Sequence, residues 1–294
     1  MNVSIIGFGE AGPVFALALK HAGMNVLAFD RLQTDSKTAD LQVAKTNSLG
    51  IGVAPSAAAA VRHAELLIST VTASEAVNAV IDASPGLHKQ CHWIDLNSVS
   101  PGTKTAVREH VEASGATFTE AVAMDTVPSK GAQVPILLCG PFAEHWSKVL
   151  NAAGMNTRVV GTHYGMASTT KLLRSVIIKG MESLFAESME AASIAGVHNE
   201  VLQSLQATYP ELNWHEIAGY QLSRASLHAQ RRAAEMREAS RTVQELGVHA
   251  TMSKAIAAKQ QELADRDLAA IYEGATVDDY INATRTMPAN SDRA

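Results

Sequence analysis

The first residues able to do chemistry form a glycine-rich hexapeptide near the start of the chain. Gly7-Phe8-Gly9-Glu10-Ala11-Gly12 follows an apolar run, 2–6, and opens a segment with helical apolar spacing, 11–22. Between a strand and a helix, such glycines permit a tight turn, close approach of the backbone to a pyrophosphate, and close helix–sheet packing. The helix N-terminus also offers free N–H groups to phosphate. The context predicts that all six residues bind a dinucleotide; a glycine turn without a ligand is the alternative.

An acidic residue stands where such a site binds ribose. Asp30 follows the second predicted strand, 26–29, and lies about 20 residues after the glycines. A carboxylate there can hydrogen-bond both ribose hydroxyls and would repel a 2′-phosphate, which favours NAD over NADP as cofactor. We also expect Arg31 beside the cofactor. Because Arg31 and Lys37 could accommodate a 2′-phosphate, NADP stays open.

Small polar side chains follow two later predicted strands, 66–71 and 92–96. Ligands of open α/β sheets bind outside the carboxyl ends of the strands. We therefore expect Val71, Thr72 and Asn97 to contact the cofactor. Asn97 and Ser98 are also predicted to contact the substrate. Helix capping is an alternative role that these residues could combine with binding.

A lysine near the start of a long predicted helix is the candidate acid–base group. Lys171, Ser175 and Lys179 recur every four residues and so share one helix face, with Arg174 nearby. A lysine at this point could exchange a proton with a substrate oxygen. We predict Lys171 and Ser175 as catalytic and Arg174 as a substrate contact. The alternative is a solvated helix face on which Lys179 pairs with Glu182.

A second basic segment lies between residues 220 and 241. Arg224, His228 and Arg231 or Arg232 fall on one helical face. An arginine there could bind a substrate carboxylate through two parallel hydrogen bonds, so His228 and Arg231 are predicted substrate contacts. Surface ion pairing is the alternative, with Glu235 and Glu238 as partners, and it is the favoured reading for Arg237 and Arg241.

The elements that would position these groups alternate between strand and helix up to residue 161. Further strands are expected at 116–123, 134–139 and 157–160, and further helices at 74–83, from Pro101, and at 142–152. This alternation predicts an α/β Rossmann fold with a doubly wound parallel sheet. The predicted domains are 1–162, a dinucleotide-binding Rossmann domain, and 163–294, an all-helical substrate and dimerisation domain.

The second half shows only helical periodicity. Helices are expected from about 165, at 198–207, 214–245 and 248–264, and near 276–285, and the residues after Met287 are predicted to be a frayed tail. On the first of these helices, Leu173, Ile177 and Leu184 share a face that we expect to pack into the core.

The overall composition excludes several kinds of partner. The net charge is −5 and no block of lysine or arginine could follow a phosphate backbone, so nucleic acid is not expected. The two cysteines cannot form a disulfide scaffold and fit a reducing compartment. The N-terminus lacks signal-peptide features, and no apolar run reaches membrane-spanning length. We expect a cytoplasmic homodimer that binds a small, anionic substrate, without a metal or a membrane.

Three segments resemble the β-hydroxyacid dehydrogenases, which include 3-hydroxyisobutyrate and 6-phosphogluconate dehydrogenases, and the resemblance extends over essentially the whole chain. Gly7–Pro13 resembles the opening glycine motif of this family. Asp95–Pro101 resembles its D-x-S-T-x-x-P segment, with Asn97 where serine is usual. Gly165 and Lys171 match the G-x-x-x-x-x-K part of its catalytic signature. The resemblance implies NAD(P)-dependent hydride transfer on a small hydroxy acid, with Lys171 as general base in oxidation and general acid in reduction.

The chain also departs from this family. Ser175 replaces the usual asparagine, and Glu120–Asp125, which includes the predicted substrate contact Met124, replaces a segment rich in serine and glycine. Lys171–Ser175 and Arg231–Met236 look more like a poorly characterised phosphogluconate-dehydrogenase-like branch, and 6-phosphogluconate is not supported as substrate. Two other functions stay open: an imine (C=N) reductase on the same scaffold, and a non-catalytic NAD-binding regulator.

Overall fold

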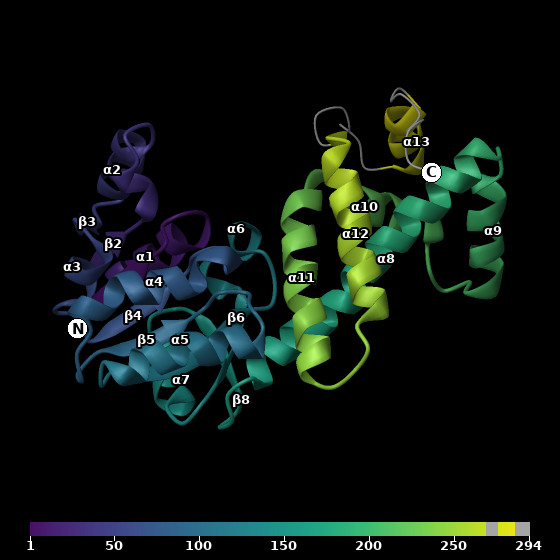
Figure 1. The fold of residues 1–294 in the computed structure, drawn as a ribbon. Helices are drawn as coiled ribbons and strands as arrows, with labels where there is room; N and C mark the ends of the chain where they lie inside the picture. Colours follow the sequence, from purple (N-terminus) through teal and green to yellow (C-terminus); the bar gives the residue numbers. More distant parts are fainter. Residues whose placement is uncertain (269–275, 286–294) are drawn as a thin grey trace. The chain divides into compact units, whose positions relative to one another are not determined.

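The computed structural model describes residues 1–268 and 276–285 (Figure 1). The chain divides into two compact units, Met1–Leu172 and Leu173–Ala294. The boundary falls inside a long helix, α8 (Met166–Ile194), whereas the sequence places it at residue 162. The division of function between the two domains stays a prediction. No helix in the described ranges combines the length and apolar composition needed to cross a bilayer, and a cytoplasmic location also stays a prediction.

The first unit is built on one eight-stranded sheet with the order β3-β2-β1-β4-β5-β6-β7-β8. The strands are β1 (Asn2–Ile6), β2 (Asn25–Phe29), β3 (Gly52–Val53), β4 (Leu66–Ser69), β5 (His92–Asp95), β6 (Thr117–Ala123), β7 (Pro135–Cys139) and β8 (Asn156–Gly161). The Rossmann-type doubly wound α/β fold is therefore confirmed.

The direction of the last two strands differs from the prediction. β7 pairs antiparallel with β6 and parallel with β8, so the prediction of a wholly parallel sheet was wrong. A parallel connection needs a crossover of a dozen or more residues, usually with a helix. Residues 124–134 contain only two short helices, the one-turn α6 (Val127–Lys130) and the 3-10 helix η4 (Gly131–Gln133), so the chain reverses there instead.

Helices cover both faces of this sheet, which explains its apolar strands. Neighbouring residues of β1 show the alternation: Ile5 packs into one core with Phe15 of α1, and Ile6 into another with Val107 of α5. The helices of this unit are α1 (Ala11–His21), α2 (Ala39–Ser48), α3 (Ala57–Val61), α4 (Ala76–Ala83), α5 (Pro101–Ala113), α6 and α7 (Ala143–Ala152).

The segment 39–61 is where the sequence prediction missed elements. It contains α2, β3 and α3, none of which the apolar pattern indicates. The buried residues of α2 are the polar Gln42 and Thr46, and β3 has only two residues, so neither element carries a periodic apolar signal.

The second unit is helical throughout its described residues. It contains most of α8, α9 (His198–Thr208), α10 (Trp214–Leu227), α11 (Ala229–Glu245), α12 (Thr251–Asp265) and α13 (Val277–Arg285). The single helix predicted over 214–245 was wrong, because the backbone leaves the helical conformation at His228, which ends α10 and precedes α11. The tail predicted after Met287 lies outside the described residues.

The predicted apolar face of α8 was also wrong. Leu173, Ile177 and Leu184 are exposed. The side of α8 that is buried carries polar residues, Ser175, Lys179 and Glu182, before the apolar Phe185, Ala186 and Met189. Periodicity identifies which residues share a helix face, but burial depends on the partners that other helices supply.

Candidate functional site

The three glycines of the loop after β1 have different structural roles. Gly7 has φ +92°, and a Cβ there would lie 2.6 Å from the Thr70 carbonyl oxygen. A Cβ at Gly12 would lie 2.2 Å from the Gly7 carbonyl oxygen. Packing within the protein therefore requires both of these glycines. A Cβ at Gly9 would meet no protein atom within 4 Å, so the space beside this backbone is open, as close approach of a pyrophosphate requires.

Two other elements hold the loop from outside. The buried Asp30 carboxylate accepts hydrogen bonds from the N–H groups of Phe8, at 2.5 Å, and Leu32, at 2.9 Å. From α2, Lys45 Nζ donates to the carbonyl oxygens of Phe8, at 2.9 Å, and Gly9, at 2.6 Å, and Gln42 also donates to Phe8. The roles of Lys45 and Gln42 were missed, because the apolar pattern of the sequence does not indicate α2.

The other predicted cofactor residues lie along the same edge of the sheet. Glu10 and Ala11 stand at the start of α1, with Glu10 exposed and Ala11 half-buried. Val71 and Thr72 follow β4, which pairs directly with β1. Arg31 follows β2 on the other side of β1. The structure thus brings the predicted residues to neighbouring strand ends, while their contact with a cofactor stays a prediction.

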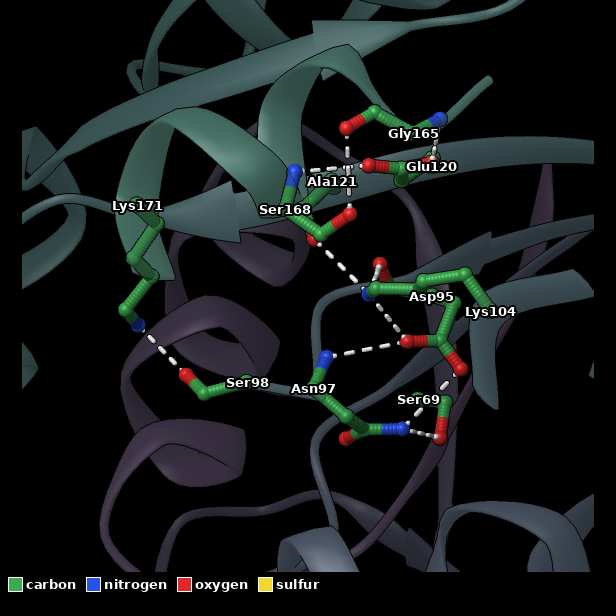
Figure 2. A network of polar contacts seen from close by, with 10 residues as sticks. All are labelled: Ser69, Asp95, Asn97, Ser98, Lys104, Glu120, Ala121, Gly165, Ser168 and Lys171. Atoms are coloured by element: carbon green, nitrogen blue, oxygen red, sulfur yellow. Dashed lines mark hydrogen bonds and ion pairs between the residues drawn. The ribbon is translucent and has the colours of Figure 1, made fainter. Parts of the chain in front are cut away.

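The loop after β5 is fixed by a buried polar network (Figure 2). Lys104 Nζ of α5 lies 2.5 Å from Asp95 Oδ1 and also donates to the Ala121 carbonyl oxygen. The Asn97 amide nitrogen donates to Asp95, at 3.0 Å, and to the Ser69 hydroxyl, at 2.9 Å. Asn97 Oδ1 is buried and has no hydrogen-bond partner among the described residues, so it remains available as an acceptor.

The sequence holds a signal for Lys104 that the prediction did not use. Lys104 shares the buried face of α5 with Val107 and Val111, three and seven positions further on. A lysine on an apolar helix face needs a buried partner, because isolated charges are costly to remove from water. Asp95 supplies that partner, and the pair anchors the segment that carries Asn97 and Ser98.

Lys171 projects from the beginning of α8 toward the loop after β5, and its Nζ donates a hydrogen bond to the Ser98 hydroxyl (Figure 2). Glu120 of β6 fixes the start of this helix. Its fully buried carboxylate accepts hydrogen bonds from the N–H groups of Gly165, at 2.6 Å, and Ser168, at 2.7 Å. A carboxylate at a helix N-terminus satisfies free N–H groups and complements the helix dipole.

The segment 120–125 contains one residue whose role was not predicted, Glu120, and one predicted substrate contact, Met124. The sequence prediction missed the role of Glu120, whose carboxylate caps α8. Met124 follows β6, is half-buried, and donates its backbone N–H to the Pro135 carbonyl oxygen, at 2.8 Å. A substrate contact by Met124 stays a prediction.

Ser175 and Arg174 lie just beyond the unit boundary on α8. Ser175 is buried and accepts a hydrogen bond from Lys179 Nζ, at 3.1 Å. Lys179 is buried too, and its ion pair is with Glu235 of α11, at 2.6 Å. The solvated helix face with a Lys179–Glu182 pair was therefore wrong. Arg174 is exposed. The catalytic role of Ser175 and the substrate role of Arg174 stay predictions.

The basic segment of the helical unit divides into internal and surface contacts. Arg232 is buried and pairs with Glu182 Oε1 at 3.0 Å. Arg231 is half-exposed, 3.8 Å from Glu235, and a nitrogen of His228 lies 3.1 Å from Arg224. Toward the end of α11, Arg237 contacts Gln261 and Arg241 contacts Glu238. Substrate contacts by His228 and Arg231 stay predictions.

Burial governs the electrostatics of the Glu182–Arg232 pair. It raises the pKa of Glu182 to about 7, although the cations of Arg232, Lys179 and Arg224 oppose this shift. It also lowers the pKa of Arg232 from its usual value. Glu182 Oε2 has no hydrogen-bond partner among the described residues, which fits a carboxyl group that holds a proton readily.

The family of the first unit follows from residues 2–161, which match the family described as the NAD-binding domain of 6-phosphogluconate dehydrogenase. The chain belongs to this family. Residues 192–263 match a second family, which is described only as a domain of unknown function. The glycine-rich loop and the sheet edge described above thus lie in an NAD-binding domain, and the resemblance found in the sequence is confirmed.

Three relatives extend the similarity to the second unit. A conserved hypothetical protein from Sinorhizobium meliloti 1021 has a solved structure that is 32% identical, with 96% of each chain covered and a TM-score of 0.76. The mitochondrial 3-hydroxyisobutyrate dehydrogenase of Drosophila melanogaster is 24% identical over 213 residues, which cover 69% of this chain and 62% of the fly protein. The 3-hydroxyisobutyrate dehydrogenase of Mycobacterium tuberculosis, solved with L-serine, is 16% identical and shares the fold with a TM-score of 0.73 over 98% of this chain and 99% of that one.

Proposed function

We propose that this protein is an NAD(P)-dependent oxidoreductase that transfers a hydride between nicotinamide and a small, anionic hydroxy acid or its oxo form. The observation that carries the proposal is the hydrogen bond between Lys171 and Ser98. It joins an acid–base group to the carboxyl end of β5, in the unit that also contains the glycine-rich loop.

Each protein group then has a defined task. The nicotinamide, when bound, would accept the hydride in oxidation and return it in reduction. In oxidation, neutral Lys171 would take the proton from the substrate hydroxyl while the C–H bond breaks and the C=O bond forms. In reduction, its ammonium group would give a proton to the carbonyl oxygen. Ser98 would orient Lys171 Nζ, and the free acceptor of Asn97 would orient a bound N–H or O–H group.

The cofactor and substrate assignments rest on charge and position. The Asp30 carboxylate lies at the glycine-rich loop and favours NAD, because it would repel a 2′-phosphate. The proposed substrate contacts are Arg174, His228 and Arg231, because their basic side chains suit an anionic substrate. A homodimer, too, stays a prediction.

A substrate screen tests this function. We expect NADH formation, measured by absorbance, when purified protein is mixed with NAD⁺ and one of a panel of small hydroxy acids. Parallel assays with NADH or NADPH and oxo acids or cyclic imines separate the dehydrogenase from the imine reductase. Tight coenzyme binding without turnover on any of these compounds would instead support the non-catalytic regulator.

The lysine is tested by Lys171→Met. We expect kcat to fall by about 10²–10⁴-fold, the usual contribution of a positioned acid–base group, with the Kd for NADH unchanged. Turnover within about tenfold of the wild type, with intact NADH binding, would show that Lys171 does not have this role.

A further inference from the structure

An ion pair spans the edge of the sheet beyond the glycine-rich loop. Arg31 NH1 lies 2.7 Å from Glu75 Oε2. Arg31 begins the short helix η1 (Arg31–Thr34), one residue beyond the end of β2, and Glu75 ends η2 (Ala73–Glu75) after β4. Because β2 and β4 pair with opposite sides of β1, the two charges meet across the carboxyl end of β1. The adenosine half of a dinucleotide binds at this edge of a Rossmann sheet.

The two partners differ in how firmly they are held. The Glu75 side chain is 19% exposed and directly precedes α4, whose N-terminal dipole end favours a carboxylate. The Arg31 side chain is 67% exposed, and the cation can therefore move more freely than the acid. The neighbouring Asp30 carboxylate is held in place by hydrogen bonds from the N–H groups of Phe8 and Leu32.

We propose that Glu75 sets the coenzyme preference of this protein by occupying Arg31. The proposal rests on the proposed function, because it assumes that the loop binds a nicotinamide dinucleotide. A free arginine beside the ribose would bind a 2′-phosphate through two parallel hydrogen bonds. Glu75 competes for that guanidinium group, and its negative charge adds to the repulsion of a phosphate by Asp30. The chain therefore prefers NAD(H), although it carries an arginine suited to NADP(H).

Glu75→Gln tests this directly, with coenzyme fluorescence titrations of NADH and NADPH as the readout. We expect NADPH to bind Glu75→Gln about tenfold more tightly than it binds the wild type, while the Kd for NADH changes by less than about twofold. Adding Arg31→Gln should remove the gain, since the released guanidinium is what binds the phosphate. The gain should also shrink at high salt, because exposed charges are screened.

Glu112→Gln is the matched control. It removes one carboxylate from the same unit, where Glu112 lies 3.9 Å from Arg108, and it should leave both Kd values unchanged. An unchanged Kd for NADPH in Glu75→Gln, with NADH still bound, would overturn the inference and leave the proposed function intact. Persistence of the gain in the Arg31→Gln double variant would also overturn it. If the wild type bound neither coenzyme, the proposed function itself would fail, and this inference with it.

Discussion

At the scale of single residues, the glycines of the glycine-rich loop have different roles: Gly12 is required by the packing of the fold, and Gly9 leaves room for a ligand. A Cβ at Gly12 would lie 2.2 Å from a backbone oxygen, whereas a Cβ at Gly9 would enter open space. Gly12→Ala should therefore destabilise the protein by about 1–3 kcal/mol, the usual result of overpacking. Gly9→Ala should unfold at the wild-type temperature but bind NADH at least about tenfold more weakly, because its methyl group occupies the approach to the pyrophosphate.

Thermal unfolding and NADH fluorescence titration check this pair of variants, with each serving as the control for the other. Wild-type NADH affinity in Gly9→Ala would contradict the placement of the pyrophosphate at this loop.

A second residue-scale prediction concerns the partner of the proposed acid–base group. Ser98→Ala removes the hydroxyl that accepts the hydrogen bond from Lys171 Nζ. We expect kcat to fall by about 10–100-fold, because a misplaced proton donor or acceptor loses much of its effect. Steady-state kinetics on the substrate found in the screen give this value.

The matched control is Ser114→Ala. It removes a hydroxyl that makes an exposed hydrogen bond to the His110 carbonyl oxygen. It should leave kcat unchanged. Equal kinetics for the two variants would show that Ser98 does not orient Lys171.

At the scale of elements, β6 determines where α8 begins. The Glu120 carboxylate accepts two backbone N–H groups at the start of this helix. In Glu120→Gln, one oxygen acceptor is replaced by a donor, and we expect a loss of about 1–3 kcal/mol, because one buried N–H is left unsatisfied. Urea unfolding measures this loss. Hydrogen exchange of the Gly165 and Ser168 amides should be faster than in the wild type, and unchanged exchange would contradict the capping role.

At the scale of the whole molecule, the helical unit should respond to pH through Glu182. Burial raises the pKa of this group from 4.5 to about 7 in the folded state. Between these values the folded chain holds a proton that the unfolded chain has released, so stability falls as pH rises through this window. The slope is at most about 1.4 kcal/mol per pH unit, and it vanishes above pH 7, where both states are ionised.

Urea unfolding of the full chain between pH 5 and 8 measures this dependence. Glu182→Gln should lose this part of the pH dependence while keeping a hydrogen-bond acceptor for Arg232. An identical pH dependence in the variant and the wild type would show that another group is responsible.

The sequence alone determined the order of the α/β and helical parts and the position of the glycine-rich loop, and it identified Asp30 and Lys171 as candidate site residues. These features are local: strand and helix periods, turn glycines and cap positions are set by residues close together in the chain. For the same reason, the weakly periodic segment 39–61 and its Lys45 were missed.

Only the tertiary structure decided which distant side chains meet. Glu120 caps a helix that begins more than forty residues later, and Arg31 forms an ion pair with Glu75 across the end of β1. The polar face of α8 is buried because α11 supplies Glu235 and Arg232 as partners. A charged side chain is buried at low cost only where it pairs with an opposite charge or a hydrogen-bonding group. Sequence spacing does not specify such partners when they come from other elements.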